Sequence, residues 1–367
     1  MAHQYMPQTE RVRGRGACRG QSICSLVDKG HFCHNFREAA TSFPRGKRHR
    51  MRAIAYQEFG DADQLKLVTL DTPTLGVDEV LIKTTYAGVN PVDWKIRKGY
   101  LKDMFPHHFP IVPGWDTVGV VDAVGKNVEK FEPGNRVYAY ARKPDVQWGT
   151  YAEYVSFGAQ HVALAPDKLS DAQASGVPLV GLTAWQSLFD FADLQAGQTI
   201  LIHAGAGGVG SLAIQLAKWK GAEVLTTGSA GNHEYLKSIG ADVVIDYRKN
   251  DFVSILKDSH PNGVDVVYDL VGGDVQEKSF GVVKEGGTLV SIVGPPSDDL
   301  RQQHHLGKAG FVFVEPNGSQ LAELAPLFDQ GLLKASPVKE YALEEAAKAH
   351  QSSESGRVRG KLVLRIR

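Results

Sequence analysis

The fold is decided by the stretch Ala196-Gly197-Gln198-Thr199-Ile200-Leu201-Ile202-His203-Ala204-Gly205-Ala206-Gly207-Gly208-Val209-Gly210-Ser211-Leu212-Ala213-Ile214-Gln215-Leu216-Ala217-Lys218. Residues 199–203 are a short, mostly aliphatic run, which is typical of a strand buried on both faces. Gly205, Gly207 and Gly210 then give the spacing G-x-G-x-x-G, and apolar residues recur at helical spacing from Val209 onward. A strand, a glycine turn and a helix in this order predict a dinucleotide site.

Each glycine of this motif has its own expected role. Gly205 would permit the tight turn, Gly207 would let the backbone approach a pyrophosphate, and Gly210 would let helix and strand pack closely. The N-terminus of the following helix would face the phosphates. The motif therefore predicts a nicotinamide-type dinucleotide as cofactor, and the alternative is a glycine-rich loop without a ligand.

Length and composition restrict the class of protein. A chain of 367 residues suggests two or three domains with ample core. Of the 41 basic and 41 acidic residues, ten basic and three acidic ones lie in residues 1–50, so the remaining chain is mildly acidic and does not suggest a nucleic-acid binder. No run of about 18 apolar residues predicts a membrane span. All three cysteines, Cys18, Cys24 and Cys33, lie in residues 1–50. The chain after them therefore cannot form a disulfide or bind a metal through a thiolate of its own.

Residues 1–50 differ from the rest, because they are rich in Arg and Gly and lack apolar periodicity. We expect a disordered basic extension, or an upstream segment before a second start at Met51. A transit peptide and an arm for nucleic acid or an acidic partner are the alternatives. Cys24, His31, Cys33 and His34 fit no zinc pattern and are interpreted as incidental. The expected location is the cytoplasm, with organellar import through residues 1–50 left open.

The chain after residue 50 predicts two kinds of structure. A β-rich, barrel-like first part has expected strands at 52–57, 63–70, 79–87, 117–124, 136–140 and 150–156. Ser170 is a good N-cap for the first helix. After the glycine motif, strands at 223–227, 243–245, 264–270 and 288–293 alternate with helices at 233–239, 251–257 and 275–283, which predicts a doubly wound parallel sheet. A strand at 310–314, helices at 319–330 and 343–352 and a closing strand at 361–366 follow, and the tail is expected to return to the first part.

At this point the sequence resembles the medium-chain dehydrogenase/reductase superfamily, and within it the zinc-independent quinone oxidoreductases of the zeta-crystallin type. The residues that carry the resemblance are the 197–218 stretch, Ala87-Gly88-Val89-Asn90-Pro91-Val92-Asp93, Pro113-Gly114, Gly149-Thr150-Tyr151-Ala152-Glu153-Tyr154, Gly181-Leu182-Thr183-Ala184-Trp185 and Gly360-Lys361-Leu362-Val363-Leu364. The resemblance covers residues 51–367. It implies an α/β protein with a GroES-like catalytic domain (51–172), a Rossmann NADP-binding domain (173–310), a return to the catalytic domain (311–367) and a cleft between the domains.

The resemblance also indicates which chemistry remains. Zinc alcohol dehydrogenases of this superfamily hold a catalytic zinc, but the matching positions here are Asn90, Trp115 and the neighbourhood of Pro178-Leu179, and the four-cysteine structural loop is missing. We therefore expect no metal. Without a Lewis acid, the remaining chemistry is hydride transfer to an acceptor that is already electrophilic, such as a quinone or an α,β-unsaturated carbonyl.

The expected cofactor is NADPH rather than NADH. An NAD enzyme usually places an acid about 20 residues after the glycines, whereas here the second strand ends in Thr227-Gly228-Ser229. Ser229, Asn232 and His233 could donate to a 2′-phosphate. By resemblance, Tyr247 is a phosphate-side residue that is kept, a lysine common at position 232 is missing, and Arg357 matches an arginine that some relatives aim at the phosphate. The full set of expected cofactor contacts is Asn90, Thr183, Gly205, Ala206, Gly207, Gly208, Val209, Gly210, Ser229, Asn232, Tyr247, Val271, Gly272, Val293, Gly294, Phe313, Val314 and Arg357.

Four residues are candidates for the catalytic site: Asn90, Asp93, Tyr100 and Trp115. By resemblance, Asn90 and Asp93 form a polar pair beside the nicotinamide, although Asp93 could be a turn cap instead. Tyr100 has nearly the spacing of a tyrosine proposed as proton donor in related enoyl thioester reductases, against a plain rim or core role. Trp115 would be a flat wall for a planar substrate or simply core. The histidines His107, His108, His304 and His305 are predicted to lie in solvated loops.

Two functions remain open at the level of sequence. The leading hypothesis is an NADPH-dependent reductase of quinones, alkenals or enones, and the alternative is a nucleotide-bound, crystallin-like or RNA-binding protein with little turnover. A homodimer is expected, because 288–293 resembles the last strand before the family's dimer edge and the apolar stretch 311–314 follows it. The alternative for 311–314 is a core segment that lines the nicotinamide pocket.

Overall fold

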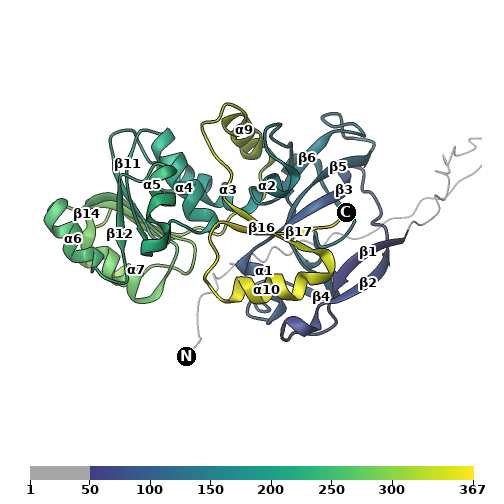
Figure 1. Ribbon diagram of the computed structural model, residues 1–367, viewed down its shortest axis with the longest axis horizontal. Coiled ribbons are helices and arrows are strands. Elements are labelled where there is room, and N and C mark those ends of the chain that lie inside the picture. The colour runs from purple at the N-terminus through teal and green to yellow at the C-terminus, as the bar shows by residue number, and fades with distance from the viewer. Residues whose placement is uncertain (1–49) are drawn as a thin grey trace, which may run out of the picture. The chain divides into compact units, whose positions relative to one another are not determined.

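The computed structural model describes residues 50–367, so the predictions for residues 1–49, with their cysteines, lie outside the described residues. The described residues belong to one compact unit. They contain a six-stranded and a seven-stranded β-sheet and two smaller two-stranded sheets (Figure 1). None of the helices within residues 50–367 is long and apolar enough to cross a membrane.

The six-stranded sheet is parallel and has the order β12-β11-β10-β13-β14-β15. Its strands are Thr199–Ile202 (β10), Glu223–Gly228 (β11), Val243–Asp246 (β12), Val264–Asp269 (β13), Val283–Ser291 (β14) and Lys308–Phe311 (β15). The helices between them are Gly208–Trp219 (α4), His233–Ser238 (α5), Phe252–Ser259 (α6), Gly273–Ser279 (α7) and Asp298–Gln303 (α8). Numbered from β10, the order is 3-2-1-4-5-6, that of a doubly wound dinucleotide fold, and it reverses between β10 and β13. The predicted Rossmann sheet is confirmed.

The seven-stranded sheet runs β16-β17-β3-β5-β6-β9, with β8 paired to β3. Its strands are Glu79–Val89 (β3), Asp116–Val124 (β5), Arg136–Tyr140 (β6), Tyr154–Gly158 (β8), Val162–Leu164 (β9), Val338–Ala342 (β16) and Lys361–Arg365 (β17). The smaller sheets pair Arg50–Ala55 (β1) with Lys66–Asp71 (β2), and His107–Val112 (β4) with Val146–Trp148 (β7). Because β17 pairs with β3 in the interior of the sheet, the last strand of the chain completes a sheet that begins near residue 79.

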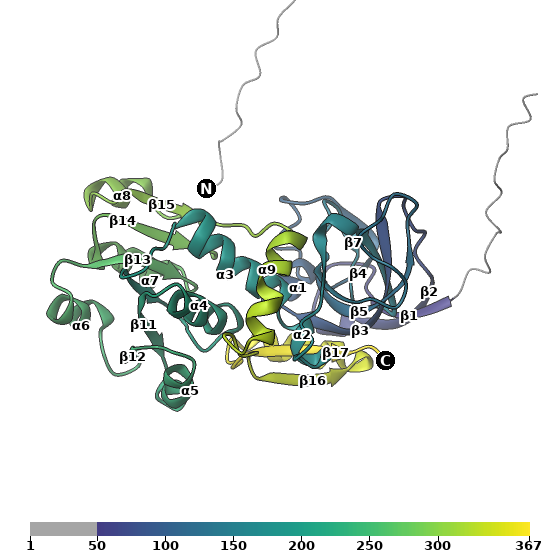
Figure 2. The ribbon, with the colours of Figure 1, turned by 90° about the horizontal axis from the view of Figure 1, so that it is seen from above.

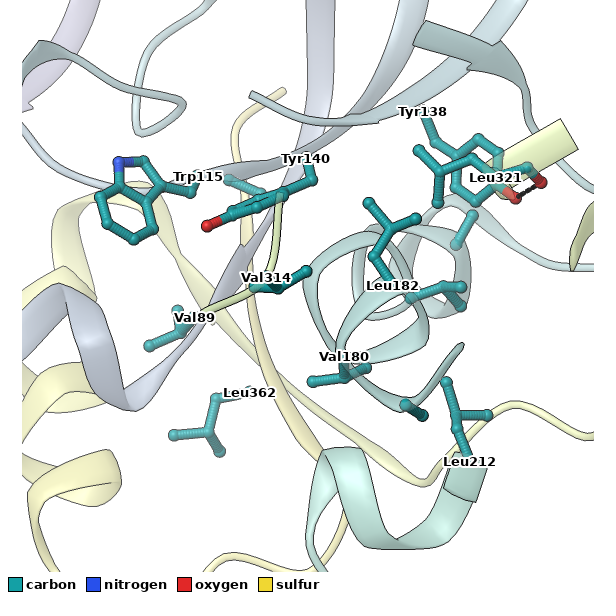
Figure 3. Close-up of a cluster of buried hydrophobic side chains, with 14 of the residues drawn as sticks. Val89, Trp115, Tyr138, Tyr140, Val180, Leu182, Leu212, Val314, Leu321 and Leu362 are labelled. Carbon is teal, nitrogen blue, oxygen red and sulfur yellow. Dashed lines mark hydrogen bonds between the residues drawn. The ribbon is translucent and has the colours of Figure 1, made fainter. Parts of the chain in front are cut away.

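Helices pack between the two large sheets. Helix α3 (Pro178–Trp185) packs against α4 and against α9 (Gly318–Asp329), and α9 also packs against β9. Figure 2 shows α3, α4 and α9 side by side. The buried side chains of this core come from both large sheets and from these helices. Figure 3 shows the part of it that α3, α4 and α9 form with the seven-stranded sheet. In that cluster the hydroxyl of Tyr138 donates to the carbonyl of Leu321 over 2.7 Å. The site residues therefore stand on elements that one continuous core holds together.

Several local predictions are wrong. The strand expected at 310–314 is β15, which ends at Phe311, because Phe313 turns away to contact Phe105 at a centroid distance of 5.6 Å. The strand expected at 288–293 is the end of β14, which stops at Ser291 and lies next to the outer strand β15. The helix expected to reach Val283 ends at Ser279, and Val283 opens β14. His107 and His108 lie in strand β4 rather than in a loop.

Short elements were missed because they carry too few residues for a periodic signal. Helix α1 (Pro91–Arg97) begins directly after a strand with proline in its first turn, and Asn90 is its N-cap. The other missed elements are α3, α8, β4, β7, β9 and β16. By contrast, Ser170 caps helix α2 (Asp171–Ser175) as predicted, with its hydroxyl accepting from Gln173 N–H at 3.2 Å. The predicted domain boundaries after residues 172 and 310 stay predictions.

Candidate functional site

The glycine loop after β10 shows by its packing why it needs glycine. A Cβ on Gly205 would lie 2.1 Å from Thr226 Oγ1, and one on Gly210 would lie 2.6 Å from the carbonyl oxygen of Ala204. The residue with positive φ is Ala204, at 51°, so Gly205 is required for close packing rather than for the turn itself. A Cβ on Gly207 would meet only one atom, at 3.5 Å, so the loop presents an open backbone there. Gly207 is also the N-cap of α4, whose free N–H groups suit a pyrophosphate.

Two further loops at the carboxyl ends of parallel strands adjoin this position. Asp269, at the end of β13, accepts from the N–H groups of Val271 and Gly272, both at 2.9 Å. Its other oxygen accepts from the hydroxyl of Ser291, at the end of β14, at 2.8 Å. The side chains of Val271 and Val293 are nevertheless exposed. The structure thus brings the predicted loops 271–272 and 293–294 to the crevice where the strand order reverses.

The loop after β11 is held by an arginine that the sequence prediction missed. Arg359 donates from Nε to Asn232 Oδ1 at 2.6 Å and from Nη2 to the carbonyl of Gly231 at 2.7 Å. Asn232 Nδ2 in turn donates to Ser229 Oγ at 3.2 Å. Arg359 reaches this loop because Gly360 N–H donates to the carbonyl of Ala206 at 2.9 Å, which fixes the chain against the glycine loop. The sequence signal for Arg359 is its place directly before the motif glycine Gly360. The sequence prediction instead named Arg357, which lies two residues earlier.

Some predicted cofactor residues stand apart from this cluster. Arg357 is exposed, and its N–H donates to Ser355 Oγ at 3.4 Å. Tyr247 is exposed as well, and the guanidinium of Arg248 lies 5.8 Å from its ring centroid. Thr183 is buried in α3, where its hydroxyl donates to the carbonyl of Leu179 at 2.6 Å. None of these three contacts involves the loop 229–232.

The predicted polar pair is buried in a charged network beneath the glycine loop. Lys361 Nζ donates to Asn90 Oδ1 and to the carbonyl of Val89, the latter at 3.1 Å, and lies 3.8 Å from Asp116 Oδ2. Asn90 Nδ2 donates to Asp116 Oδ2 at 2.9 Å, and Leu179 N–H donates to Asp116 Oδ1 at 2.7 Å. Both ends of the Asn90 amide therefore have partners inside the protein. Lys361 and Asp116 were missed because nothing local marks two residues so distant in sequence as partners.

Burial changes the ionisation of this network. It raises the pKa of Asp116 and lowers the pKa of Lys361, because both charges lose their hydration. The opposite charge works against each shift: Lys361 lowers the pKa of Asp116, and Asp116 raises that of Lys361. The side chain of Lys361 also closes the space beside Gly208, where a Cβ would lie 2.7 Å from Lys361 Cδ. The network thus brings the seven-stranded sheet into contact with the start of α4.

Asp93 sits one turn further on, at the start of α1. Its Oδ2 accepts from Asn90 N–H at 2.8 Å and from the hydroxyl of Tyr151 at 3.0 Å. Asp93 therefore caps the start of α1, which was the alternative role predicted for it. His350 Nε2 lies 3.2 Å from the same hydroxyl. Burial raises the pKa of Asp93 to about 7, with Asp116 adding to the shift, and burial lowers the pKa of His350 to about 3. The other oxygen of Asp93 has no protein partner among residues 50–367.

Trp115 belongs to an aromatic cluster. Its ring lies 5.9 Å from that of Tyr140 and 6.4 Å from that of Phe105, in edge contacts, and Phe105 contacts Phe313. The guanidinium of Arg142 lies over Phe105 at 5.8 Å and over Phe313 at 5.2 Å. Trp115 is therefore buried and also stands among residues near the predicted nicotinamide segment 313–314. Tyr100, by contrast, is 67% exposed and has its ring edge against Trp94, so it does not join this cluster.

The predicted loop histidines lie in different environments, and the predicted absence of a metal can be examined from the side chains present. His305 is exposed, while His107 is half-buried, with Nδ1 2.7 Å from the carbonyl oxygen of Phe105. Within the described part of the chain no three His, Cys, Asp or Glu side chains are grouped as metal ligands. Of the positions that the resemblance matches to the ligands of a catalytic zinc, Asn90 carries an amide and Trp115 an indole, and no cysteine lies near Pro178-Leu179. The Lys361 ammonium lies beside Asn90. This donor set does not fit zinc, which prefers thiolate, imidazole and carboxylate.

Comparison with known proteins agrees with this geometry. Residues 76–167 match the family model described as an alcohol dehydrogenase GroES-like domain, and residues 239–364 match one described as a zinc-binding dehydrogenase. The chain is 39% identical to the 2-methylene-furan-3-one reductase of Solanum lycopersicum, over 86% of this chain and 79% of the relative. It is 36% identical, over the same shares, to the chloroplastic NADPH-dependent alkenal/one oxidoreductase of Arabidopsis thaliana.

The fold has a solved counterpart as well. The structure of the quinone oxidoreductase from Coxiella burnetii superposes with a TM-score of 0.79 at 38% identity, and the match covers 87% of this chain and all of that one. The GroES-like and Rossmann sheets, the glycine loop and these similarities agree with one another. The chain therefore belongs to the medium-chain dehydrogenase/reductase superfamily.

Proposed function

We propose that this protein is an NADPH-dependent oxidoreductase that transfers a hydride to a quinone or to an α,β-unsaturated carbonyl without zinc. The observation that carries the proposal is the glycine loop with its open backbone at Gly207. By resemblance, the zinc-ligand positions of the seven-stranded sheet and the segment after it match Asn90, Trp115 and the neighbourhood of Pro178-Leu179, where no cysteine stands. An acceptor that is already electrophilic needs no Lewis acid. The similarity to reductases whose names include alkenals, a furanone and quinones supports the same acceptor class.

The residues around the glycine loop fit NADPH. Loop 205–210 and the N-terminus of α4 would hold the pyrophosphate, and loops 271–272 and 293–294 would border the ribose and nicotinamide. Ser229, Asn232 and Arg359 would hold the 2′-phosphate, because a hydroxyl, an amide and a guanidinium can all donate to it and no carboxylate stands in that loop. When bound, NADPH supplies the hydride. The protein's part is to position the acceptor and to exclude water.

Cofactor preference can be tested at Ser229. Ser229→Asp should weaken NADPH binding by about ten- to a hundredfold, or about 1–3 kcal/mol, because a carboxylate would oppose the phosphate and compete for Arg359. NADH binding should change little. Titration of the intrinsic fluorescence with each cofactor measures both dissociation constants.

The matched control for this charge is Ser238→Asp, which lies in the same connection between β11 and β12 but at the exposed end of α5. It should leave both dissociation constants unchanged. Arg359→Ala should weaken NADPH binding as Ser229→Asp does. Equal affinity of the unaltered protein for NADPH and NADH would contradict the assignment.

The proposed independence from zinc leads to a separate prediction. NADPH oxidation with 1,4-quinones and short alkenals should continue after dialysis against a strong chelator, and ethanol oxidation should be undetectable. The assay follows NADPH absorbance, with elemental analysis for zinc on the same sample. Chelator-sensitive alcohol oxidation would overturn the mechanism. Failure to oxidise NADPH with any quinone or enone would favour the alternative, a nucleotide-bound protein with little turnover.

Oligomeric state and location are proposals of the same kind. We infer a homodimer through β15, because this strand is one of the two outer strands of the six-stranded sheet within the described residues and the apolar stretch 311–314 begins at its end. Light scattering in solution tests it. A cytoplasmic location is proposed, with import through residues 1–50 as the alternative, and microscopy of the tagged full chain distinguishes the two.

A further inference from the structure

Two buried hydrogen-bond donors near Trp115 have no acceptor. The hydroxyl of Tyr140 and Nε of Arg142 are both shielded from solvent, and neither has a partner at hydrogen-bond distance and angle among residues 50–367. Tyr140 is completely buried at the end of β6, and Arg142 follows two residues later. The two side chains are close neighbours, because both the charge of Arg142 and its hydrogen-bonding interaction with the Tyr140 hydroxyl oppose the rise of the Tyr140 pKa. Buried donors without acceptors are rare in folded proteins, because each one costs free energy.

The neighbouring tyrosine on the same strand shows the contrast. Tyr138 is equally buried, but its hydroxyl donates to the carbonyl of Leu321 at 2.7 Å. Figure 3 shows the two hydroxyl groups at opposite ends of the cluster, with that of Tyr140 on the side where Trp115 and Val314 lie. Strand β6 therefore carries two tyrosine hydroxyls: that of Tyr138 donates a hydrogen bond within the protein, and that of Tyr140 donates to no residue in 50–367.

The surroundings of the two donors suit a flat, electron-poor ring or a conjugated carbonyl. Trp115, Phe105 and Phe313 supply aromatic faces and edges, and the guanidinium of Arg142 is stacked against two of these rings. Its Nη2 is engaged by Glu315, an ion pair that fixes the guanidinium while leaving Nε free. A fixed cationic donor beside a neutral one is the arrangement that stabilises a developing oxyanion.

We propose that Tyr140 O–H and Arg142 Nε–H form a binding site for the acceptor's oxygen, and that they stabilise the negative charge that this oxygen gains during reduction. This rests on the proposed function. In an enone, a hydride added to the β-carbon forms a C–H bond, and the π electrons shift to leave an enolate oxygen. Water then gives a proton to the α-carbon, and hydroxide passes to the buffer. In a quinone, the hydride leaves a hydroquinone anion, which water protonates on oxygen.

The charge states of the two donors match this role. Burial raises the pKa of Tyr140 far above its ordinary value, Arg142 opposes the shift, and Asp116 and Glu315 add to it. The phenol therefore stays protonated at neutral pH and donates a hydrogen bond without losing its proton. The site thus supplies the polarisation that a zinc ion supplies in metal-dependent members of such folds. Tyr140 and Arg142 touch the reacting oxygen and are, in this proposal, catalytic residues.

The first test compares the two tyrosines. Tyr140→Phe should lower kcat with enones by about 100-fold, the usual effect of removing one oxyanion donor, while its melting temperature stays equal or rises. Tyr138→Phe removes the same atom two residues away. It should lower the melting temperature, because the Leu321 carbonyl loses its donor, and should leave kcat unchanged. Equal loss of kcat in both variants, or none in Tyr140→Phe, would overturn the proposal.

The second test does not require turnover. 4-Nitrophenol resembles the reduced, oxyanionic acceptor, and its ionised form is yellow. The full-length protein saturated with NADP⁺ should bind the yellow anion and lower its pKa. Tyr140→Phe and Arg142→Met should each weaken that binding about tenfold or more, whereas Tyr138→Phe, which removes a hydroxyl that donates to the Leu321 carbonyl, should bind normally. Binding that is equal in all four proteins would contradict an oxyanion site.

The two proposals can fail separately. If the unaltered protein reduces no quinone or enone but binds nitrophenolate in a Tyr140-dependent way, the oxyanion site stands and the reductase function falls. If it reduces enones and Tyr140→Phe does so equally well, the function stands and the oxyanion site falls.

Discussion

Replacing Lys361 by methionine is expected to lower the free energy of unfolding by about 3–5 kcal/mol, the usual cost of removing one partner of a buried ion pair. Lys361 is only 3% exposed, and Asp116 beside it is fully buried. Methionine has a similar length, but it would leave the Asp116 carboxylate without its cation. It would also leave the side-chain amide oxygen of Asn90 and the backbone carbonyl of Val89 without this donor. Urea unfolding followed by circular dichroism measures the loss.

The controls separate charge from packing. Lys361→Met combined with Asp116→Asn removes both charges and should regain a large part of the loss, because no buried charge remains unpaired. Lys83→Met, on the exposed side of β3, should stay within about 0.5 kcal/mol of the unaltered protein. A loss below about 1 kcal/mol in Lys361→Met would mean that the ion pair contributes little to stability.

Asp93→Asn should remove a pH dependence worth about 4 kcal/mol, which corresponds to the shift of the Asp93 pKa from its ordinary 3.8 to about 7. Between these pH values the folded state holds the Asp93 proton and the unfolded state has lost it. Stability in the unaltered protein therefore falls as the pH rises from about 4 to 7 through this group. Asparagine can still accept from Asn90 N–H and the Tyr151 hydroxyl, so the variant should be more stable at pH 7.

His350 acts in the opposite direction. Its pKa is lowered to about 3, so the unfolded state binds its proton first and stability falls as the pH drops below about 6.5. The unaltered protein should therefore show a shallow maximum, and Asp93→Asn should show stability that keeps rising from pH 4 to 6.5. Thermal unfolding across this range checks it. Asp122→Asn, on an exposed position of β5, is the control and should leave the profile unchanged.

The sequence predicts those parts of the site that depend on local pattern. The 199–218 stretch predicts its strand, glycine loop and helix, because spacing and periodicity are local properties. It does not predict that Gly205 is needed against Thr226, since that contact depends on the position of the neighbouring strand. Arg359 and Arg357 are two residues apart in the same tail. Only the contact between Gly360 and Ala206 decides which of them reaches loop 229–232.

The rest of the site depends on contacts between distant segments. Lys361 meets Asn90 and Asp116 because β17 pairs with β3, and no periodic pattern in either segment records that pairing. Tyr140 and Arg142 look like ordinary strand-end residues in the sequence. Their importance lies in missing partners, which become visible only when every neighbour has been placed. Tyr100 shows the converse, because its spacing resembles a functional tyrosine while its side chain faces solvent.

The contact between Gly360 and Ala206 affects how this protein could be recombined with its relatives. The residues that would select the cofactor come from two places in the gene, Ser229 and Asn232 within the Rossmann sheet and Arg359 near the end of the chain. A chimera that grafts only segment 173–310 into another scaffold would leave Arg359 behind, and Lys361 with it. In the proposed assignment, cofactor choice depends on two segments that are distant in the sequence, and an exchange that preserves it must carry Arg359 and the last strand along with the nucleotide-binding sheet.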